Sequence, residues 1–364
     1  MNIDFSPRRW QSVKEHYRAW WAGELERPLL AVTLNGRDAG RPAPALPYHG
    51  FTAFYGLDTP AEQIVDRWTY QLETQKFLGD AFPSMWPNYG AGAIAAFLGA
   101  ELHNTEHTVW FRPRAVRDIR DISFAYDPEN PWFRRVKEVV RAAVGQWHGR
   151  VQTSMTDLGG NLDVLSSFRP GENLLLDLYD HPDEVKRLTW EAHGLWFRYF
   201  DEINACLQPA NPGYTAWTPI FSDEPYYMLQ CDFCYMISPA MLDEFVKPEL
   251  AAACARIANP FYHLDGPGQI PHLDSLLEIK ELKGVQWIPG DGQPGIGHWP
   301  QIYRKIIAAG KRAQLFGYGK WADIERTFDT IVQQVGSAKG LILIAGAEVK
   351  DEAAVMRFLE RYGQ

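Results

Sequence analysis

The sequence predicts an α/β fold, a single (β/α)8 TIM barrel with additional N-terminal helices. Two observations carry this prediction. Short apolar runs alternate with helical patterns through the second half of the 364-residue chain, and short glycine-rich loops join them. No repeat or low-complexity run marks a boundary, so we expect one domain over residues 1–364. Residues 1–80 are expected to form a helical extension packed on the barrel.

The N-terminal part predicts helices around one strand. Apolar residues recur at helical spacing over residues 6–26, up to Gly23. The apolar run 28–34 predicts a strand, and helical periodicity resumes over residues 60–78. Residues 37–48 between them are rich in Pro, Gly and Ala, which is typical of a loop.

The remaining elements follow from the same two periodicities. Strands are expected at residues 108–112, 150–155, 214–220, 261–265, 285–288, 313–316 and 341–344. Helices are expected at residues 132–147, 182–204, 238–258, 270–283, 300–309, 322–335 and 352–362. Because parallel strands end at one rim of a barrel, we expect the chemistry where these strands end.

Composition and charge exclude several classes of function. The chain is 46% hydrophobic and 22% charged, which is an ordinary globular mixture. A net charge of −9 and a pI of about 5.6 predict no nucleic-acid partner. No apolar stretch of membrane-spanning length and no secretory leader is visible, so we expect a cytoplasmic protein without a membrane partner.

The strongest candidate site lies in the stretch Phe261-Tyr262-His263-Leu264-Asp265-Gly266. Side chains two positions apart on a strand point to the same side, so His263 and Asp265 are expected to face one cavity. An alternative is that the imidazole and carboxylate form a satisfied core pair without a functional role.

Other candidates follow the ends of other predicted strands. Glu224 lies beside Asp223 and aromatic residues, where the alternative is a solvated acidic turn. Asp157 precedes two glycines, and its alternative role is to cap the next helix. The chain also has 14 Trp, 16 Tyr and 19 Phe, which suit a deep pocket for a ring. The expected substrate-binding residues are Trp86, Asn88, Tyr89, Asp157, Asn161, Trp217, Tyr226, Trp287 and Asp291.

The cysteines do not predict a thiolate metal site. Cys231 and Cys234 have two-residue spacing, but no second pair follows them. We therefore interpret the four cysteines as buried structural residues.

Several short stretches, in this order, resemble the uroporphyrinogen decarboxylase superfamily, which includes cobalamin-dependent methyltransferases. They are Asp180-His181-Pro182-Asp183-Glu184-Val185, Ile237-Ser238-Pro239 with Phe245 and Pro248, Tyr262-His263-Leu264-Asp265-Gly266, and Ala345-Gly346-Ala347-Glu348-Val349. The resemblance implies a single (β/α)8 barrel with extra N-terminal helices and a pocket at the carboxyl-terminal mouth.

The chain departs from both branches of that superfamily. In the methyltransferase branch a His-x-Cys element and a later cysteine hold zinc, but here Asp265 and Ala347 occupy the cysteine positions. In place of a thiolate site, the residues of this chain predict an oxygen-rich metal site of His263, Asp265 and Glu224, for zinc or a harder divalent ion. The arginine-bearing loop of the decarboxylase branch has at most one counterpart, Arg37.

We therefore expect methyl transfer or demethylation of a small-molecule substrate, with a corrinoid protein as partner. His263 would be a metal ligand or general base, Asp265 would orient it or share the metal, and Glu224 would be a further ligand or acid. One alternative is a lyase or decarboxylase acting on a small non-porphyrin acid. Another is a non-catalytic barrel that only binds a ligand.

Overall fold

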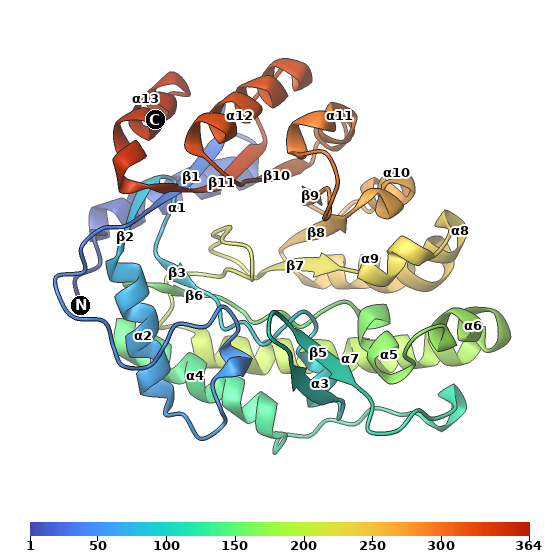
Figure 1. Ribbon diagram of the computed structural model, residues 1–364. Helices are drawn as coiled ribbons and strands as arrows, with labels where there is room; N and C mark the ends of the chain where they lie inside the picture. The colour runs from blue at the N-terminus through green and yellow to red at the C-terminus, as the bar shows by residue number, and fades with distance from the viewer.

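The structure is a computed structural model that describes residues 1–364, and it is a mixed α/β fold (Figure 1). The strands are β1 (Leu29–Asn35), β2 (Gln75–Gly79), β3 (Ser84–Met85), β4 (Glu101–Asn104), β5 (Val109–Arg112), β6 (Gln152–Thr153), β7 (Tyr226–Gln230), β8 (Asn259–Asp265), β9 (Gly284–Ile288), β10 (Arg312–Gly317) and β11 (Leu341–Glu348).

Helices connect these strands. The α-helices are α1 (Pro7–Ala22), α2 (Ala61–Glu73), α3 (Ile94–Phe97), α4 (Pro131–Trp147), α5 (Asn161–Phe168), α6 (Asn173–Asp180), α7 (Pro182–Leu207), α8 (Pro239–Met241), α9 (Lys247–Arg256), α10 (Leu273–Leu277), α11 (Pro300–Ala308), α12 (Trp321–Val335) and α13 (Glu352–Arg361). Short 3₁₀ turns include η3 (Asp232–Met236) and η5 (Pro267–His272), and Leu242–Val246 forms a π-helical turn.

The central sheet has seven strands in the order β2-β1-β11-β10-β9-β8-β7. Its strands run parallel except β2, which is antiparallel to β1. β3 and β6 form a separate parallel pair, and β4 and β5 form an antiparallel hairpin. Parallel strands with helical crossovers place their carboxyl ends at one edge, which positions the site described below.

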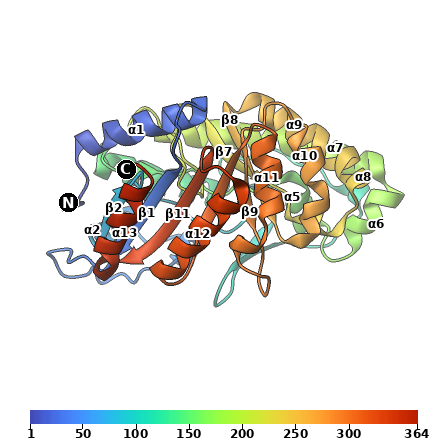
Figure 2. The ribbon, with the colours of Figure 1, turned by 90° about the horizontal axis from the view of Figure 1, so that it is seen from above.

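Helix α1 covers the opposite, amino-terminal edge of the sheet, where it runs along the strand ends in Figure 2. The helix begins after Ser6, whose side chain accepts a hydrogen bond from a first-turn amide, and ends at Gly23, where φ is +78°. Trp20 stacks on Phe261 with ring centroids 6.0 Å apart. Arg312, the first residue of β10, donates to the Trp20 carbonyl at 3.0 Å. The amino ends of the strands are therefore closed by packing.

Helices also cover the outer face of the sheet, where α11, α12 and α13 lie side by side beyond β9, β10 and β11 (Figure 1). The largest buried apolar cluster includes Trp287, Leu315 and Leu343 of these strands. A smaller cluster joins α2 and α4, with Trp68 and Trp147 at its centre. No helix of this structure combines the length and the apolar character needed to span a membrane.

Most of the predicted elements are present, and three predictions were wrong in detail. Residues 75–79 form β2, although they were predicted as the end of a helix. Residues 214–220 form no strand, because Pro219 cannot donate to a ladder and Tyr214 instead pairs back to Ser222 in a turn. The strand in this part of the chain is β7, which begins at Tyr226 and is buried on both faces. Residues 270–283 contain only the short α10 after η5.

Candidate functional site

The candidate site is built on the carboxyl-terminal ends of β7, β8 and β9. The register aligns Gln230, His263 and Gln286 at one level across the three strands. His263 and Asp265 point to the same side of β8, as expected from the alternation of side chains along a strand. Nε2 of His263 lies 3.9 Å from Oδ2 of Asp265, and the two side chains are 12% and 40% exposed.

A chain of side-chain hydrogen bonds fixes the His263 ring. Nε2 of Gln286 donates to Oε1 of Gln314 at 3.0 Å, so Oε1 of Gln286 is turned toward Nδ1 of His263 and is hydrogen-bonded to it. Because a carboxamide oxygen only accepts, Nδ1 carries the proton in this arrangement. Nε2 is then left with its lone pair on the side of Asp265, as in a histidine that binds a metal or accepts a proton.

Asp232 is the third member of this site. It begins η3, directly after β7, and each of Asp232, His263 and Asp265 offers one ligand atom within 4.8 Å of the others. The carboxylate of Asp163 holds this turn by accepting from the backbone amides of Asp232 at 3.0 Å and Phe233 at 2.8 Å. One imidazole nitrogen and two carboxylates fit Zn²⁺ or a harder divalent cation.

The electrostatics of the cluster favour a positive charge between its carboxylates. Desolvation by surrounding protein raises the pKa of Asp232, His263 lowers it, and Asp265 raises it again. Burial and the charge of Asp232 also raise the pKa of Asp163. Like charges at this separation disfavour each other's ionised form, and a bound cation would relieve that repulsion.

Glu224 does not belong to this site, which corrects the predicted ligand set. Glu224 is exposed and lies two residues before β7, at the amino-terminal edge of the sheet. His263 is aligned with Gln230, six residues further on, so Glu224 is roughly 20 Å away along the strand direction. The prediction placed Glu224 after a strand that does not exist. Asp232, which follows the real strand, takes its place.

Two of the predicted aromatic residues do lie beside His263. The Trp217 ring packs edge-on against the His263 ring with centroids 5.1 Å apart, and Trp86 lies 6.3 Å from Trp217. The indole Nε1 atoms of both tryptophans are buried and have no hydrogen-bond partner. Trp86 and Trp217 therefore form an aromatic wall over the imidazole with two free donors.

Trp287 and Tyr226 were also predicted as substrate-binding residues, but the structure places them elsewhere. Trp287 is aligned with Leu264, so it points to the opposite side of the sheet from His263 and packs against Trp299 at 5.2 Å. Tyr226 is the first residue of β7 and packs against Trp21 of α1 at the amino-terminal edge. Both are packing residues.

Asn88 and Tyr89 also have structural roles. The Asn88 carboxamide donates to the Gly50 carbonyl and accepts from the Gly90 amide, both at 3.0 Å. Tyr89 is buried and packs edge-on against Trp132 at 6.2 Å. The Asn88 carboxamide is therefore paired within the protein, whereas the Tyr89 hydroxyl is buried without a hydrogen-bond partner, and ligand binding by these two residues stays a prediction.

Asp157 lies in the turn between β6 and α5, and Asn161 is the first residue of α5. Oδ1 of Asp157 accepts from the Gly159 amide at 2.9 Å and from the Tyr227 hydroxyl at 3.3 Å. Burial raises the pKa of Asp157 to about 7. Asn161 is 6% exposed, and its Oδ1 has no partner. A Cβ at Gly160 would lie 2.0 Å from the Gln230 carbonyl, so this turn sits against the end of β7.

Two cavities open at the carboxyl-terminal edge of the sheet. One, of about 580 Å³, is lined by Asp265 and by Asp291, an exposed loop residue. The other, of about 460 Å³, lies over β1, β2, β10 and β11, and no predicted site residue lines it. Both are lined by Phe316 and Tyr318, so these two aromatic residues stand between them.

Sequence reasoning missed Asp232, Gln286 and Gln314. A sequence feature was available for the two glutamines, because each stands between two apolar residues in the buried middle of a strand. Asp232 stands between Cys231 and Cys234, whose spacing drew attention to sulfur. Burial raises the pKa of Cys231, so its thiol is protonated, in agreement with the structural role predicted for these cysteines.

Comparison with known proteins does not identify a family. No protein-family model matches the chain, and a search of curated proteins found no significant match.

Proposed function

We propose that this protein is a one-carbon-transfer enzyme resembling the uroporphyrinogen decarboxylase superfamily, which transfers a methyl group of a small substrate with the help of a corrinoid protein. The observation that carries the proposal is the Asp232, His263 and Asp265 cluster, whose ligand atoms lie within 4.8 Å of one another. It lies at the carboxyl-terminal ends of parallel strands, where enzymes of this architecture keep their chemistry.

The proposal includes a closed (β/α)8 barrel formed by β1, β3, β6, β7, β8, β9, β10 and β11. Backbone hydrogen bonds support this reading on both sides of the β3–β6 pair. The Asp80 amide donates to the Leu30 carbonyl at 2.7 Å, next to β1, and the Met155 amide donates to the Thr215 carbonyl at 2.8 Å. The first bond ties the residue after β2 to β1, and the second ties the residues after β6 to the segment 214–222, which leads into β7.

The residues of the site would hold and orient the reacting groups. Asp232, Asp265 and Nε2 of His263 would bind a divalent cation, which as a Lewis acid would polarise the substrate heteroatom that carries the methyl group. Gln286 keeps the proton of His263 on Nδ1, so Nε2 remains a ligand. Trp86 and Trp217 would exclude water from the face of the imidazole, and a partner protein would present the corrinoid at the open edge.

A cation site built from carboxylates would not need the cysteine ligands of the methyltransferase branch. Asp265 and Ala347 stand where the resembling methyltransferases have thiolate ligands for zinc. Cys231 and Cys234 are buried, and burial raises the pKa of Cys231, so it is a poor substitute. A site with two carboxylates suits a harder cation than a thiolate site does.

Methyl transfer to free cobalamin tests the proposal. Chelator-treated protein is given a divalent cation, a methylated ether, amine or thioether, and cob(I)alamin in place of the corrinoid protein. We expect methylcobalamin formation, followed by absorbance, to require the cation and to be lost in His263→Ala. Glu224→Ala is the matched control and is expected to retain activity. Methylcobalamin formation at equal rates in His263→Ala and the unaltered protein would refute the proposal.

A second candidate, decarboxylation of a small acid, has one specific observation in its favour. Asp157 has a pKa raised to about 7 by burial, so it is available as a protonated acid near neutral pH. If release of CO₂ from a panel of small acids is lost in Asp157→Asn and is insensitive to chelator, this second function is the correct one.

A further inference from the structure

We propose that the cavity of about 460 Å³ over β1, β2, β10 and β11 binds a neutral, planar aromatic ring with one hydrogen-bonding substituent. This inference rests on the proposed function in taking that ring as part of the substrate. The binding itself is independent of any reaction. A cavity of this volume holds a molecule of one or two fused rings.

The shape of the cavity comes from small residues on its strands. Ala31, Gly317, Ala345 and Gly346 line it where larger side chains would fill the space. A Cβ at Gly346 would have only Nδ2 of Asn35 nearby, at 3.8 Å, so the space above this glycine is open. The side chains of β1 and β11 thus leave a slot at the carboxyl-terminal edge of the sheet.

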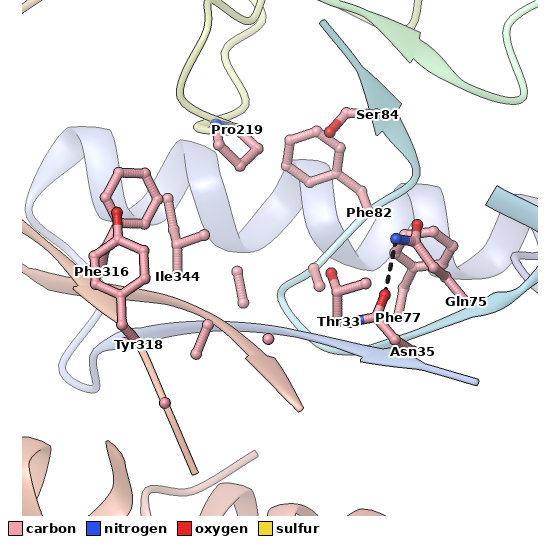
Figure 3. A pocket seen from close by; sticks show the side chains of 16 residues that line it. Thr33, Asn35, Gln75, Phe77, Phe82, Ser84, Pro219, Phe316, Tyr318 and Ile344 are labelled. Atoms are coloured by element: carbon pink, nitrogen blue, oxygen red, sulfur yellow. Dashed lines mark hydrogen bonds between the residues drawn. The ribbon is translucent and has the colours of Figure 1, made fainter. Parts of the chain in front are cut away.

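Aromatic side chains form the walls of this slot. In Figure 3, Phe316 and Tyr318 stand on one side of the cavity, Phe77 on the opposite side, and Phe82 beside Pro219 above it. Rings pack on one another by offset or edge-to-face contact and gain energy beyond the area that they bury. A planar aromatic ligand would make such contacts on two sides at once.

Three polar side chains of the cavity, Thr33, Asn35 and Gln75, are gathered at one end, while Ser84 and Tyr318 lie away from them in Figure 3. Nε2 of Gln75 donates to Oδ1 of Asn35 at 3.1 Å. Nδ2 of Asn35 and Oε1 of Gln75 make no hydrogen bond with the protein, which leaves one donor and one acceptor of this amide pair for a ligand. A single hydroxyl can use both. A sugar, with hydroxyls around its whole ring, would leave most of them without partners against the phenyl walls.

The cavity also selects against charge. None of its sixteen lining residues carries a charged side chain, and the whole chain has a net charge of −9. An anion bound there would lose its hydration without a counter-charge. The segment 214–222 links this cavity to the cation cluster, because Pro219 lines the cavity while Trp217 packs on His263.

Calorimetric titration with a matched ligand series tests the proposal. The probes are 2-naphthol, its anionic analogue 2-naphthoate, naphthalene without the hydroxyl, and the saturated decahydro-2-naphthol. We expect 2-naphthol to bind at least about tenfold more tightly than each of the other three. Equal affinity for 2-naphthoate or for decahydro-2-naphthol would overturn the proposal. This comparison needs no variant and so does not depend on any variant folding.

Two variants then show which of the two cavities binds the aromatic ring. Gly346→Leu fills this cavity, while Gly295→Leu adds the same side chain to the neighbouring cavity, where a Cβ meets nothing within 4 Å. We expect Gly346→Leu to weaken 2-naphthol binding at least about tenfold and Gly295→Leu to leave it unchanged. The reverse pattern would place the ligand in the other cavity and refute the proposal.

The same measurements separate this inference from the proposed function. We expect His263→Ala to retain 2-naphthol binding, and Gly346→Leu to retain binding of a divalent cation. If methyl transfer fails while the ligand series behaves as expected, the proposed function fails alone. If methyl transfer occurs but 2-naphthol does not bind, the cavity assignment fails alone.

Discussion

His263 on β8 and Gln286 on β9 are joined by a hydrogen bond between Nδ1 and Oε1, and this contact decides which ring nitrogen faces Asp232 and Asp265. Gln286 is itself held by Gln314 on β10, so three neighbouring strands fix one imidazole. Outer partners of this kind orient a histidine ligand and raise its basicity.

Loss of this hydrogen bond should weaken cation binding. Gln286→Met keeps the volume of the side chain but leaves the His263 ring free to rotate or change tautomer. We expect the affinity for a divalent cation, measured by calorimetry, to fall about 10- to 100-fold. The matched control is Gln230→Met, on the other strand beside His263, because Gln230 makes no side-chain hydrogen bond to the ring. Similar losses in both variants would show that Gln286 has no orienting role.

The buried carboxylate of Asp80 should be important for stability. It accepts from Nδ1 of His16 and Nη1 of Arg27, both at 2.8 Å, and from the Leu30 amide at 2.9 Å. Asp80→Ala leaves the largely buried guanidinium of Arg27, which is 15% exposed, without its partner, so we expect the free energy of unfolding to fall by about 3–5 kcal/mol in urea titrations. Asp223→Ala, which removes a more exposed ion pair with Arg18, should cost no more than about 1 kcal/mol.

The pH dependence of the Asp80 contribution has a defined sign. Burial alone would raise its pKa, but the hydrogen bonds from His16 and Arg27 outweigh burial, so the pKa lies below the usual 3.8. The stabilisation is present above the unfolded-state value and is lost as the pH falls below it. The difference in stability between the unaltered protein and Asp80→Ala should therefore shrink only in acid.

The contribution of Asp157 to the free energy of unfolding should depend on pH in the opposite direction. Its pKa is about 7 in the folded protein against 3.8 for an ordinary aspartate. As the pH rises from about 4 to about 7, Asp157 ionises first in the unfolded state, so its contribution to the free energy of unfolding falls by about 1.4 kcal/mol per pH unit. Below about pH 4 the full stabilising contribution of Asp157 is present, and above about pH 7 its contribution does not fall further.

Asp157→Asn removes this titration while it keeps the oxygen that accepts from Gly159 and Tyr227. We expect its free energy of unfolding to vary less between about pH 4 and about pH 7 than that of the unaltered protein. Asp291→Asn, at an exposed position, is the control and should leave the pH profile unchanged. An unchanged profile in Asp157→Asn would contradict the raised pKa.

The turn after β6 depends on a close backbone approach. Gly159 has φ of +80°, and a Cβ there would lie 2.5 Å from Cα of Gly92. We expect Gly159→Ala to lower the free energy of unfolding by well over about 2 kcal/mol, because backbone strain and a steric clash act together. At Gly99, φ is +104° and a Cβ would have nothing within 4 Å. Gly99→Ala should therefore lower the free energy of unfolding through backbone strain alone, by about 1–2 kcal/mol. Equal losses would exclude a role for the Gly92 contact.

The parallel part of the sheet could be predicted because its strands are apolar runs bounded by glycine and separated by helices. β8, β9, β10 and β11 all lie within a few residues of their expected positions. β7 was missed because Asp223, Glu224 and Pro225 look like the end of a strand when they actually precede one. Local sequence does not show which of two adjacent apolar runs joins the ladder, since long-range pairing decides it.

The misplaced strand also explains which residues of the site were predicted correctly and which were not. The pairing of His263 with Asp265 depends only on the alternation of side chains along one strand, so it could be predicted from the sequence. The third carboxylate depends on the strand that lies beside β8, and the wrong strand led to Glu224 in place of Asp232. Trp287 was misplaced because a strand buried on both faces gives no sign of which residues point inward.

Calorimetric titration of Mn²⁺ and Zn²⁺ into chelator-treated protein tests the central claim most directly. We predict one saturable site per chain that is lost in Asp232→Ala and in His263→Ala and retained in Glu224→Ala. Absence of saturable binding, or binding that survives both Asp232→Ala and His263→Ala, would contradict the claim that these side chains form a cation site.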